Sequence, residues 1–367
     1  MKDEEIFSSN GIRLSWKEWL ITGIILAFLF ALIPKLWQRI EPFDPGPDYR
    51  IPYALSEDYW HFSRYCRIAA TGKRVLVVGD SVMWGEYVTP DATLPEQLNA
   101  RVGENRFANL GVNGIHPVAM AGLIDYYGRA LSNRDIVLHY NPLWMCSPRH
   151  DLQTDKEFRF NHPKLVPQFF PRIPCYKDPY AERLGIVFGR YLPMRGWANH
   201  LSIAYFDNMD IPAWTLEHPM GNPLNAITLE LPQPDTAQRH GGKSWIEAGM
   251  AEQRFEWVDP AVSLQWRFFQ RTVRTLKARG NNVFVLVGPF NEHIIAPDNR
   301  ETYARVKEKI AAWLDQEAIP HYMAPLLPSE LYGDASHPLS EGYVLLAGHL
   351  LEDAAFQSFL LQRRASL

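Results

Sequence analysis

Cysteine is scarce in this sequence, and its three cysteines form no familiar pattern. They are Cys66, Cys146 and Cys175, an odd number with no C-x-x-C spacing. This arrangement excludes a zinc-binding cysteine motif and a disulfide framework. A Cys146–Cys175 disulfide remains open for an oxidising compartment, but three unpaired, buried thiols are the simpler interpretation.

Runs of basic residues are also missing, and the charge is nearly balanced. The 37 Lys and Arg residues against 41 Asp and Glu residues give a net charge of −4. This balance argues against nucleic acid as the main partner. With 47% hydrophobic and 21% charged residues, the chain is not largely disordered. At roughly 150 residues per domain, its 367 residues allow one large domain or two ordinary ones.

Long apolar runs are absent except for one near the N-terminus. The mean hydropathy of −0.23 excludes a protein with many membrane spans. No charge falls at residues 19–34, between Glu18 and Lys35. A spanning helix needs about 20 residues, and Lys17 and Lys35 can extend the usable length by snorkelling. Three tryptophans stand where an aromatic belt is expected, Trp16, Trp19 and Trp37. We therefore expect residues 1–40 to be a short tail and a single transmembrane anchor.

Two other interpretations of this run are weaker. A cleaved signal peptide usually has a shorter apolar region and a small-residue cleavage site, which is missing here. A core helix of a soluble domain is disfavoured because the run is uniformly apolar and precedes a stretch rich in Pro and Asp, residues 41–52. We expect residues 41–70 to be a linker and lead-in to the main domain.

The charges that flank the apolar run bear on its orientation. Lys2, Arg13 and Lys17 precede the run, whereas Lys35 and Arg39 follow it closely. The positive-inside rule slightly favours a cytoplasmic N-terminus. We expect a single-pass protein whose main domain lies outside the cytoplasm, in the periplasm or the extracellular space.

The rest of the chain predicts an α/β fold. Apolar runs that end at turn residues predict strands at 75–78, 136–138 and 283–287, with weaker candidates at 107–111 and 319–323. Helical patterns lie between them, at 93–102 with a Thr93–Glu96 capping box, and at 117–131, 262–279, 299–317 and 342–360. This alternation predicts a doubly wound parallel sheet, whose sites form at the carboxyl ends of its strands.

One long stretch interrupts the alternation. Residues 146–260 hold 13 of the 28 prolines and four tryptophans but no long periodic run. A loop of this length is rarely structureless inside a compact domain. We therefore predict one domain at residues 71–367 that carries an inserted subdomain or lid at 146–260.

The first chemical motif is Gly79-Asp80-Ser81, directly after the first predicted strand. A serine at a strand-to-helix turn can expose its hydroxyl, and nearby backbone N–H groups can stabilise a developing oxyanion. The motif is not G-x-S-x-G, which disfavours an α/β-hydrolase elbow. It is also neither a P-loop nor G-x-G-x-x-G, so phosphate binding is not indicated.

The second motif is Asp334-Ala335-Ser336-His337, between the last strand and the last helix. A nucleophilic serine needs a base, and that base needs an orienting group. Because Asp334 lies three residues before His337, one turn of chain can bring the carboxylate to the imidazole. A plain turn capped by Asp334 is the alternative.

Two further positions follow the second and third strands, Gly114 and Asn141. Gly114 can present an unobstructed backbone N–H, and Asn141 can donate from its amide. Together with the Ser81 N–H they could form an oxyanion hole. Singly, each is also explained by turn chemistry.

The order of these four motifs resembles the SGNH (GDSL-type) hydrolases, a family of esterases, lipases, thioesterases and polysaccharide deacetylases. The resemblance covers residues 74–141 and 282–351. It implies a flavodoxin-like three-layer sandwich with a central parallel sheet. It also implies that Ser81 is the nucleophile, that Asp334 and His337 complete a triad, and that Gly114 and Asn141 join Ser81 in the oxyanion hole.

Two departures from the family's motifs bear on the substrate. Pro142 follows Asn141, where many members have aspartate, and it pushes Asn141 towards an extended backbone. Bulky Met83 and Trp84 follow the serine and could narrow the pocket. We expect Trp84, His139 and Tyr140 to line that pocket.

Three functions fit these observations. The first is an anchored serine esterase that removes acyl groups from an envelope glycan or lipid. The second is an O-acyltransferase that passes the same acyl group to a polysaccharide, together with a membrane-bound acyl-transfer partner. The third is a non-catalytic glycan-binding or assembly protein on an SGNH scaffold. The sequence shows no metal-ligand pattern, and we expect no metal and no cofactor.

Overall fold

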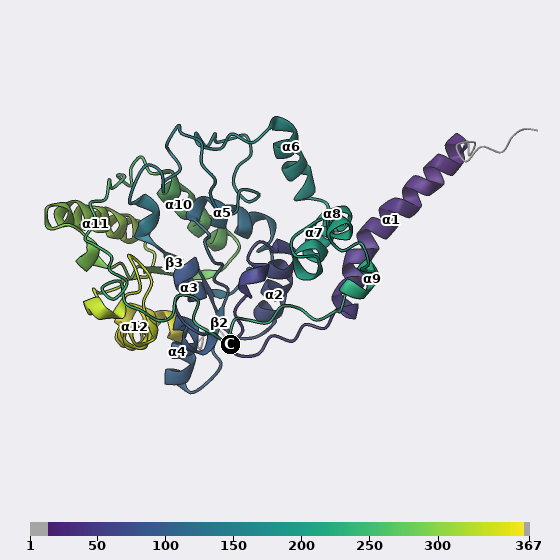
Figure 1. The fold of residues 1–367 in the computed structure, drawn as a ribbon. Coiled ribbons are helices and arrows are strands. Elements are labelled where there is room, and N and C mark those ends of the chain that lie inside the picture. Colours follow the sequence, from purple (N-terminus) through teal and green to yellow (C-terminus); the bar gives the residue numbers. More distant parts are fainter. Residues whose placement is uncertain (1–13, 363–367) are drawn as a thin grey trace, which may run out of the picture.

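Five parallel strands form the centre of the computed structural model, which describes residues 14–362 (Figure 1). The strands lie in the order β2-β1-β3-β4-β5, and every neighbouring pair is parallel. Their bounds are β1 Val75–Val78, β2 Phe107–Asn109, β3 Asp135–Tyr140, β4 Asn282–Val287 and β5 His321–Met323. All five predicted strands are present, which confirms an α/β fold with a parallel central sheet. Lys2 and Arg13, used above for orientation, lie outside the described residues.

Helices cover both faces of this sheet. Leu76 and Val78 of β1 point into a core shared with α2 (Tyr59–Thr71), α5 (Pro117–Tyr126), α10 (Leu264–Ala278) and α11 (Arg300–Gln316). Val75 and Val77 point to the other side, where α4 (Leu94–Val102), α12 (Ser340–Glu352) and α13 (Ala354–Gln362) pack. Successive strand residues thus feed opposite cores, as a sheet buried on both faces requires.

Three details of the predicted helices are wrong. Thr93 precedes α4 but does not cap it, because its hydroxyl donates to the Pro90 carbonyl and no capping box forms. α5 ends at Tyr126 rather than 131, since the N–H groups of Tyr127 and Gly128 both close on the Leu123 carbonyl. The last helix is two helices, α12 and α13, which are bent by 71° at Asp353. The side chain of Asp353 accepts from the Phe356 N–H and starts the second.

The insertion at residues 146–260 has helices only in its middle part and is partly built into the main core. Its first third contributes Leu152, Leu165 and Val166 to the core beneath α5 and α10. The remainder contains α6 (Tyr180–Gly189), α7 (Pro193–Tyr205), α8 (Ile211–Glu217) and α9 (Pro223–Ala226). α7, α8 and α9 gather beside the lower half of the N-terminal helix (Figure 1).

The N-terminal helix α1 (Trp16–Ile40) is long and apolar enough to cross a membrane. Ser15 and Glu18 form a capping box at its start. Its side chains are almost all exposed up to Ala31, and the rest of the protein packs on it from Leu32 onward. The predicted apolar helix is therefore present and projects away from the sheet domain (Figure 1).

A buried ionic cluster joins the end of α1 to the domain. Arg64 Nη1 of α2 lies 2.5 Å from Glu41 Oε1, and His200 Nε2 of α7 lies 2.8 Å from Glu41 Oε2. The other ring nitrogen of His200 lies 2.6 Å from Asp58 Oδ2. Residues 41–52, expected to be a linker, are therefore held at both ends, because Glu41 and Arg50 are fully buried. Pro42, Asp44 and residues 46–48 between them are exposed.

This cluster predicts a pH-dependent stability. Burial alone would lower the pKa of His200, but Asp58 and Glu41 raise it to about 9. The folded protein therefore holds this proton more tightly than the unfolded chain. The resulting stabilisation, on the order of 3 kcal/mol, is present below about pH 6.5 and is lost as pH rises through about 9.

His200→Gln should remove this contribution. We expect the melting temperature of the wild type to fall more steeply than that of the variant between about pH 6.5 and 9. Thermal unfolding of both full-length proteins across this range measures the difference. Parallel curves for the two proteins would show that His200 is not charged in the folded state.

Candidate active site

Ser81 stands at the turn between β1 and the short helix α3 (Ser81–Trp84). The Asp80 side chain caps this turn by accepting from the Val82 N–H at 3.0 Å. Gly79 is required here, because a Cβ atom would lie 2.3 Å from the side chain of Met83 and 2.8 Å from that of His139. The turn therefore holds the serine at the carboxyl edge of the sheet, as predicted.

The three residues expected to form a triad lie together. The Ser81 hydroxyl lies 2.8 Å from His337 Nε2, and His337 Nδ1 lies 2.8 Å from Asp334 Oδ2. The other oxygen of Asp334 accepts from the backbone N–H groups of Ser336 and His337 at 2.8 and 2.9 Å. These bonds hold the carboxylate against the imidazole, which in turn faces the serine hydroxyl.

The charges of this trio are set by their burial and by one another. Burial would raise the pKa of Asp334, but His337 and the two backbone N–H groups lower it to about 2. Burial would likewise lower the pKa of His337, but Asp334, with Asp80 and Glu86 further away, raises it above the ordinary value. Asp334 is therefore ionised at neutral pH, and His337 is a stronger base than a free imidazole.

Tyr87 covers the outer side of the trio and was not predicted. Its ring stacks on that of His337, with centroids 5.5 Å apart and an interplanar angle of 28°. Burial and the nearby Asp334 carboxylate raise the pKa of Tyr87, so its hydroxyl stays neutral. Gly333 leaves room for this ring, since a Cβ there would lie 2.3 Å from it.

The insertion closes over Tyr87 from the outside. His240 stacks on the Tyr87 ring with centroids 4.5 Å apart. Glu86 holds this segment, since its Oε1 lies 2.9 Å from His240 Nε2 and 3.4 Å from Arg239 Nε. Part of the insertion thus contacts the site, as a lid would. Neither Glu86 nor His240 stands in a motif that sequence reasoning could have recognised.

Asp80 anchors the floor of the site through three side chains. Its carboxylate accepts from Asn141 Nδ2 and Trp144 Nε1, each at 2.9 Å, and His139 Nδ1 lies 3.2 Å from its other oxygen. Burial would raise the pKa of Asp80, but the neighbouring His139 outweighs this and the pKa is lowered. This carboxylate therefore fixes the end of β3 against the turn that bears Ser81.

Of the three residues predicted to form an oxyanion hole, Ser81 and Gly114 have free backbone N–H groups, whereas the Asn141 amide is partly bonded. The N–H groups of Ser81 and Gly114 donate no hydrogen bond to any residue in the range 14–362. Gly114 adopts φ +68°, where a Cβ would also lie 2.4 Å from the Asn161 amide. Asn141 has the extended backbone expected before Pro142, but one of its amide hydrogens is already committed to Asp80, which leaves the other for a ligand.

A polar hollow of about 370 Å³ opens beside Gly114. Its side chains come from the segment before α2, from the loops after α3 and β2, and from the insertion, and include Tyr53, Glu57, Glu86, Asn113, Asn161, His162 and Asn208. Asn113 Nδ2 lies 2.5 Å from Glu86 Oε2, which ties this loop to the edge of the candidate site. The hollow offers carboxylate and amide groups to a ligand rather than an apolar slot.

The three residues expected to line the pocket do not line this hollow. Trp84 is buried, with its Nε1 donating to the Ile51 carbonyl and the Arg50 guanidinium 4.2 Å from its ring centroid. Tyr140 points into the core under α10. His139 lies beneath Asp80 and contacts the Gly288 carbonyl through its second nitrogen. All three side chains are buried in contacts behind the site and are not open to a ligand.

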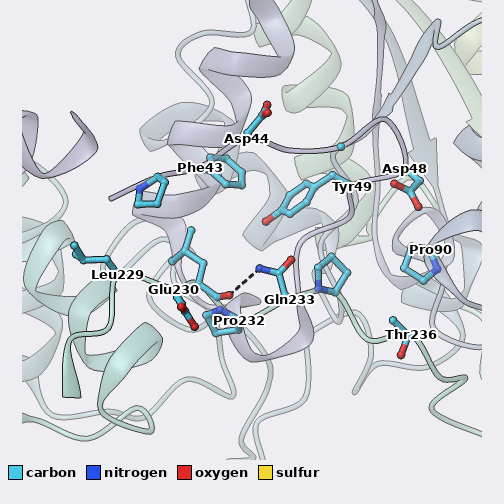
Figure 2. A pocket seen from close by; sticks show the side chains of 14 residues that line it. Phe43, Asp44, Asp48, Tyr49, Pro90, Leu229, Glu230, Pro232, Gln233 and Thr236 are labelled. Carbon is cyan, nitrogen blue, oxygen red and sulfur yellow. Dashed lines mark hydrogen bonds between the residues drawn. The ribbon is translucent and has the colours of Figure 1, made fainter. Parts of the chain in front are cut away.

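A larger groove, of about 630 Å³, lies away from these residues (Figure 2). It runs between the chain after α1 and a proline-rich part of the insertion, and Figure 2 shows Phe43 and Tyr49 facing Pro232 and Gln233 across it. Its lining includes Asp44, Asp48 and Glu230 but no serine, cysteine or histidine. The larger of the two cavities is therefore not the one beside the candidate catalytic residues.

The structure also bears on metal-binding groups and on the state of the three cysteines. Within residues 14–362, no group of three or more His, Cys, Asp and Glu side chains is arranged to hold a metal ion. Cys66, Cys146 and Cys175 are all free and buried, which confirms the interpretation as unpaired thiols.

Comparison of the chain with protein-family models and with curated proteins found no match. The functional inference therefore rests on the geometry of Ser81, His337 and Asp334.

The raised pKa of His337 predicts the pH at which activity is lost on the acid side of its pH profile. If the neutral imidazole of His337 acts as the base for Ser81, activity should be lost as His337 takes up a proton. Because its pKa lies above the ordinary 6.5, the midpoint should also lie above about 6.5. Glu86→Gln should move this midpoint to lower pH, because it removes one of the carboxylates that raise this pKa.

The measurement is kcat/KM against pH for a soluble ester, with Glu330→Gln as a control at an exposed carboxylate in the same loop as Asp334. A wild-type midpoint below the ordinary histidine value would contradict the assignment of His337 as the base.

Proposed function

We propose that this protein is a membrane-anchored serine esterase that cleaves O-acyl esters through an acyl-enzyme on Ser81. The observation that carries this proposal is the unbroken chain from the Ser81 hydroxyl through His337 to Asp334, with both contacts at 2.8 Å. A nucleophile, a base and an orienting carboxylate in this order are the requirements for acyl transfer through serine.

The mechanism follows from these contacts. His337 Nε2 takes the hydroxyl proton as Ser81 Oγ attacks the ester carbonyl, and Asp334 stabilises the imidazolium that forms. The free N–H groups of Ser81 and Gly114, with the remaining Asn141 hydrogen, stabilise the oxyanion. His337 then gives its proton to the departing alcohol. Water attacks the acyl group with His337 again as base, and the carboxylic acid leaves.

The SGNH assignment is part of this proposal. The strand order 2-1-3-4-5 is that of flavodoxin-like sheets, in which sites form at the carboxyl ends of the strands. Ser81 follows β1, Gly114 follows β2 and Asn141 follows β3, while Asp334 and His337 follow β5. The motifs therefore meet at the same edge of the sheet.

We also propose that α1 anchors the protein in a membrane, with the sheet domain outside the cytoplasm. The helix is 25 residues long and exposes apolar side chains over most of its length. At 1.5 Å per residue, the free part at residues 16–31 is about 24 Å long. A hydrocarbon core of about 30 Å would therefore also reach the part of α1 that packs on the domain from Leu32 onward.

Transfer to a glycan is the second candidate, and the polar hollow favours it. Glu57, Asn113 and Asn161 beside Gly114 suit a sugar hydroxyl better than an acyl chain. The same acyl-Ser81 could then be attacked by that hydroxyl instead of water. The acyl donor would in that case be supplied by a membrane-bound acyl-transfer partner.

A substrate panel tests the proposal. Full-length protein in detergent would be assayed with acyl esters of increasing chain length and with O-acetylated glycans, each with and without an unmodified glycan acceptor. Release of free acid supports the esterase, and acyl transfer to the acceptor supports the second candidate. If neither product forms with any substrate, the non-catalytic binding or assembly role becomes the better account.

A further inference from the structure

Residues 180–224 expose an unusual amount of apolar surface. Outside α1, nine of the 17 exposed large hydrophobic side chains of the described residues fall in this stretch of 45 residues. Phe188 is 66% exposed, Leu216 83% and Met220 98%. Helix α6 has no buried residue at all, although it is largely apolar. Such a concentration marks an interaction surface rather than ordinary surface scatter.

This surface is continuous with the anchor helix. Trp37 of α1 packs edge-on against Trp197 of α7, with ring centroids 5.5 Å apart. Leu201, Phe206 and Trp214 extend the same apolar cluster into α8. Helices α7, α8 and α9 lie beside the lower half of α1, on the side of the molecule from which it projects (Figure 1).

The direction of α1 relative to this surface is fixed. Glu41, at the end of α1, is held by Arg64 of α2 and His200 of α7 in the buried ionic cluster. The domain also packs on α1 as far up as Leu32, three residues before Lys35 and therefore inside the apolar run. If α1 crosses a bilayer, the helices beside it stand at the level of the bilayer surface.

We propose that α6 to α9 rest on the bilayer, with their exposed apolar side chains inserted at the boundary between headgroups and acyl chains. This inference rests on the membrane anchoring proposed above. Residues 177–226 carry four Lys and Arg against five Asp and Glu, so the attraction is apolar and does not require anionic lipid. Because Ile203 and Asn208 also line the polar hollow, the docked insertion would hold the candidate site close to the membrane surface.

Spin labels on single introduced cysteines test this docking in the full chain, reconstituted into vesicles of neutral phosphatidylcholine. The native cysteines are buried, and the labelled wild type measures their background. The test sites are Phe188→Cys, Leu216→Cys and Met220→Cys. Ile25→Cys reports the anchor, and Glu308→Cys on α11, at the far end of the molecule, reports water (Figure 1).

Collision rates with oxygen, which enters lipid, and with a water-soluble nickel chelate are then compared. We expect the ratio of oxygen to nickel collisions at the three test sites to be several-fold higher than at position 308, and lower than at position 25. A high ratio of oxygen to nickel collisions at position 25, together with ratios at the test sites as low as that at position 308, would overturn the docking and leave the anchoring intact.

Two other results would also count against the proposal. A water-like value at position 25 would refute the anchoring, and the docking with it. Protection from both reagents, with spin–spin broadening that grows with the protein content of the vesicles, would show that a second copy of the chain covers the surface.

Discussion

Ser81→Ala is expected to reduce kcat for ester hydrolysis by about 10⁶-fold, and His337→Ala by a similar factor. Each removes one end of the 2.8 Å contact on which nucleophilic attack depends. Because the two groups act as a unit, the double variant should be no slower than either single one. Steady-state or single-turnover hydrolysis of the best ester from the panel measures this.

The chain offers a matched control for this experiment. Ser147 Oγ lies 2.8 Å from His150 Nδ1 at an exposed position, a second serine–histidine contact. Within residues 14–362 no carboxylate contacts His150, so this pair has no orienting group, and Ser147→Ala should keep full activity. Equal losses in the Ser81 and Ser147 variants, or residual activity above about one per cent in Ser81→Ala, would remove the basis for the proposed mechanism.

Asp334→Asn is expected to lower kcat by about 10⁴-fold while the protein stays folded. The amide keeps the size of the carboxylate and can still accept from the Ser336 and His337 N–H groups. It no longer stabilises the imidazolium, and it can hold the ring in the wrong tautomer, with Nε2 protonated towards Ser81.

The control for Asp334→Asn is Glu330→Gln, which removes the same charge from the same loop at an exposed position. It should leave kcat within about twofold of the wild type, as surface substitutions usually do. Turnover by Asp334→Asn close to the wild-type rate, with intact circular dichroism, would show that His337 needs no carboxylate partner. A structural role for Asp334 would instead lower the melting temperature together with activity.

The sequence predicted the site where its chemistry is local. Gly79-Asp80-Ser81 and Asp334 to His337 are short motifs at strand ends, and a parallel sheet brings such ends together whatever lies between them. The partners that complete the site are not local. Tyr87 meets His240 across more than 150 residues, and no periodicity or motif connects them.

The failed predictions have a similar cause. Tyr140 and His139 stand beside Asn141 in sequence, but neither side chain reaches the hollow. The ring of Tyr140 packs against Trp266 and Phe269 of α10, and His139 lies against the buried Asp80 carboxylate. Glu41 appears in a stretch with linker composition, yet three polar partners from distant helices bury it. The composition of a segment indicates whether it tolerates exposure to solvent. Whether it is in fact exposed depends on partners from distant parts of the chain, which the composition does not reveal.

The most direct test of the central claim is covalent labelling of the full-length protein with a fluorophosphonate. Such probes react with a serine that an adjacent base has activated. The account predicts one adduct per chain, located at Ser81 by peptide mass spectrometry, absent from Ser81→Ala and strongly slowed in His337→Ala, with Ser147→Ala labelled as the wild type. An adduct at another serine, or no adduct on a protein that hydrolyses esters, would contradict it.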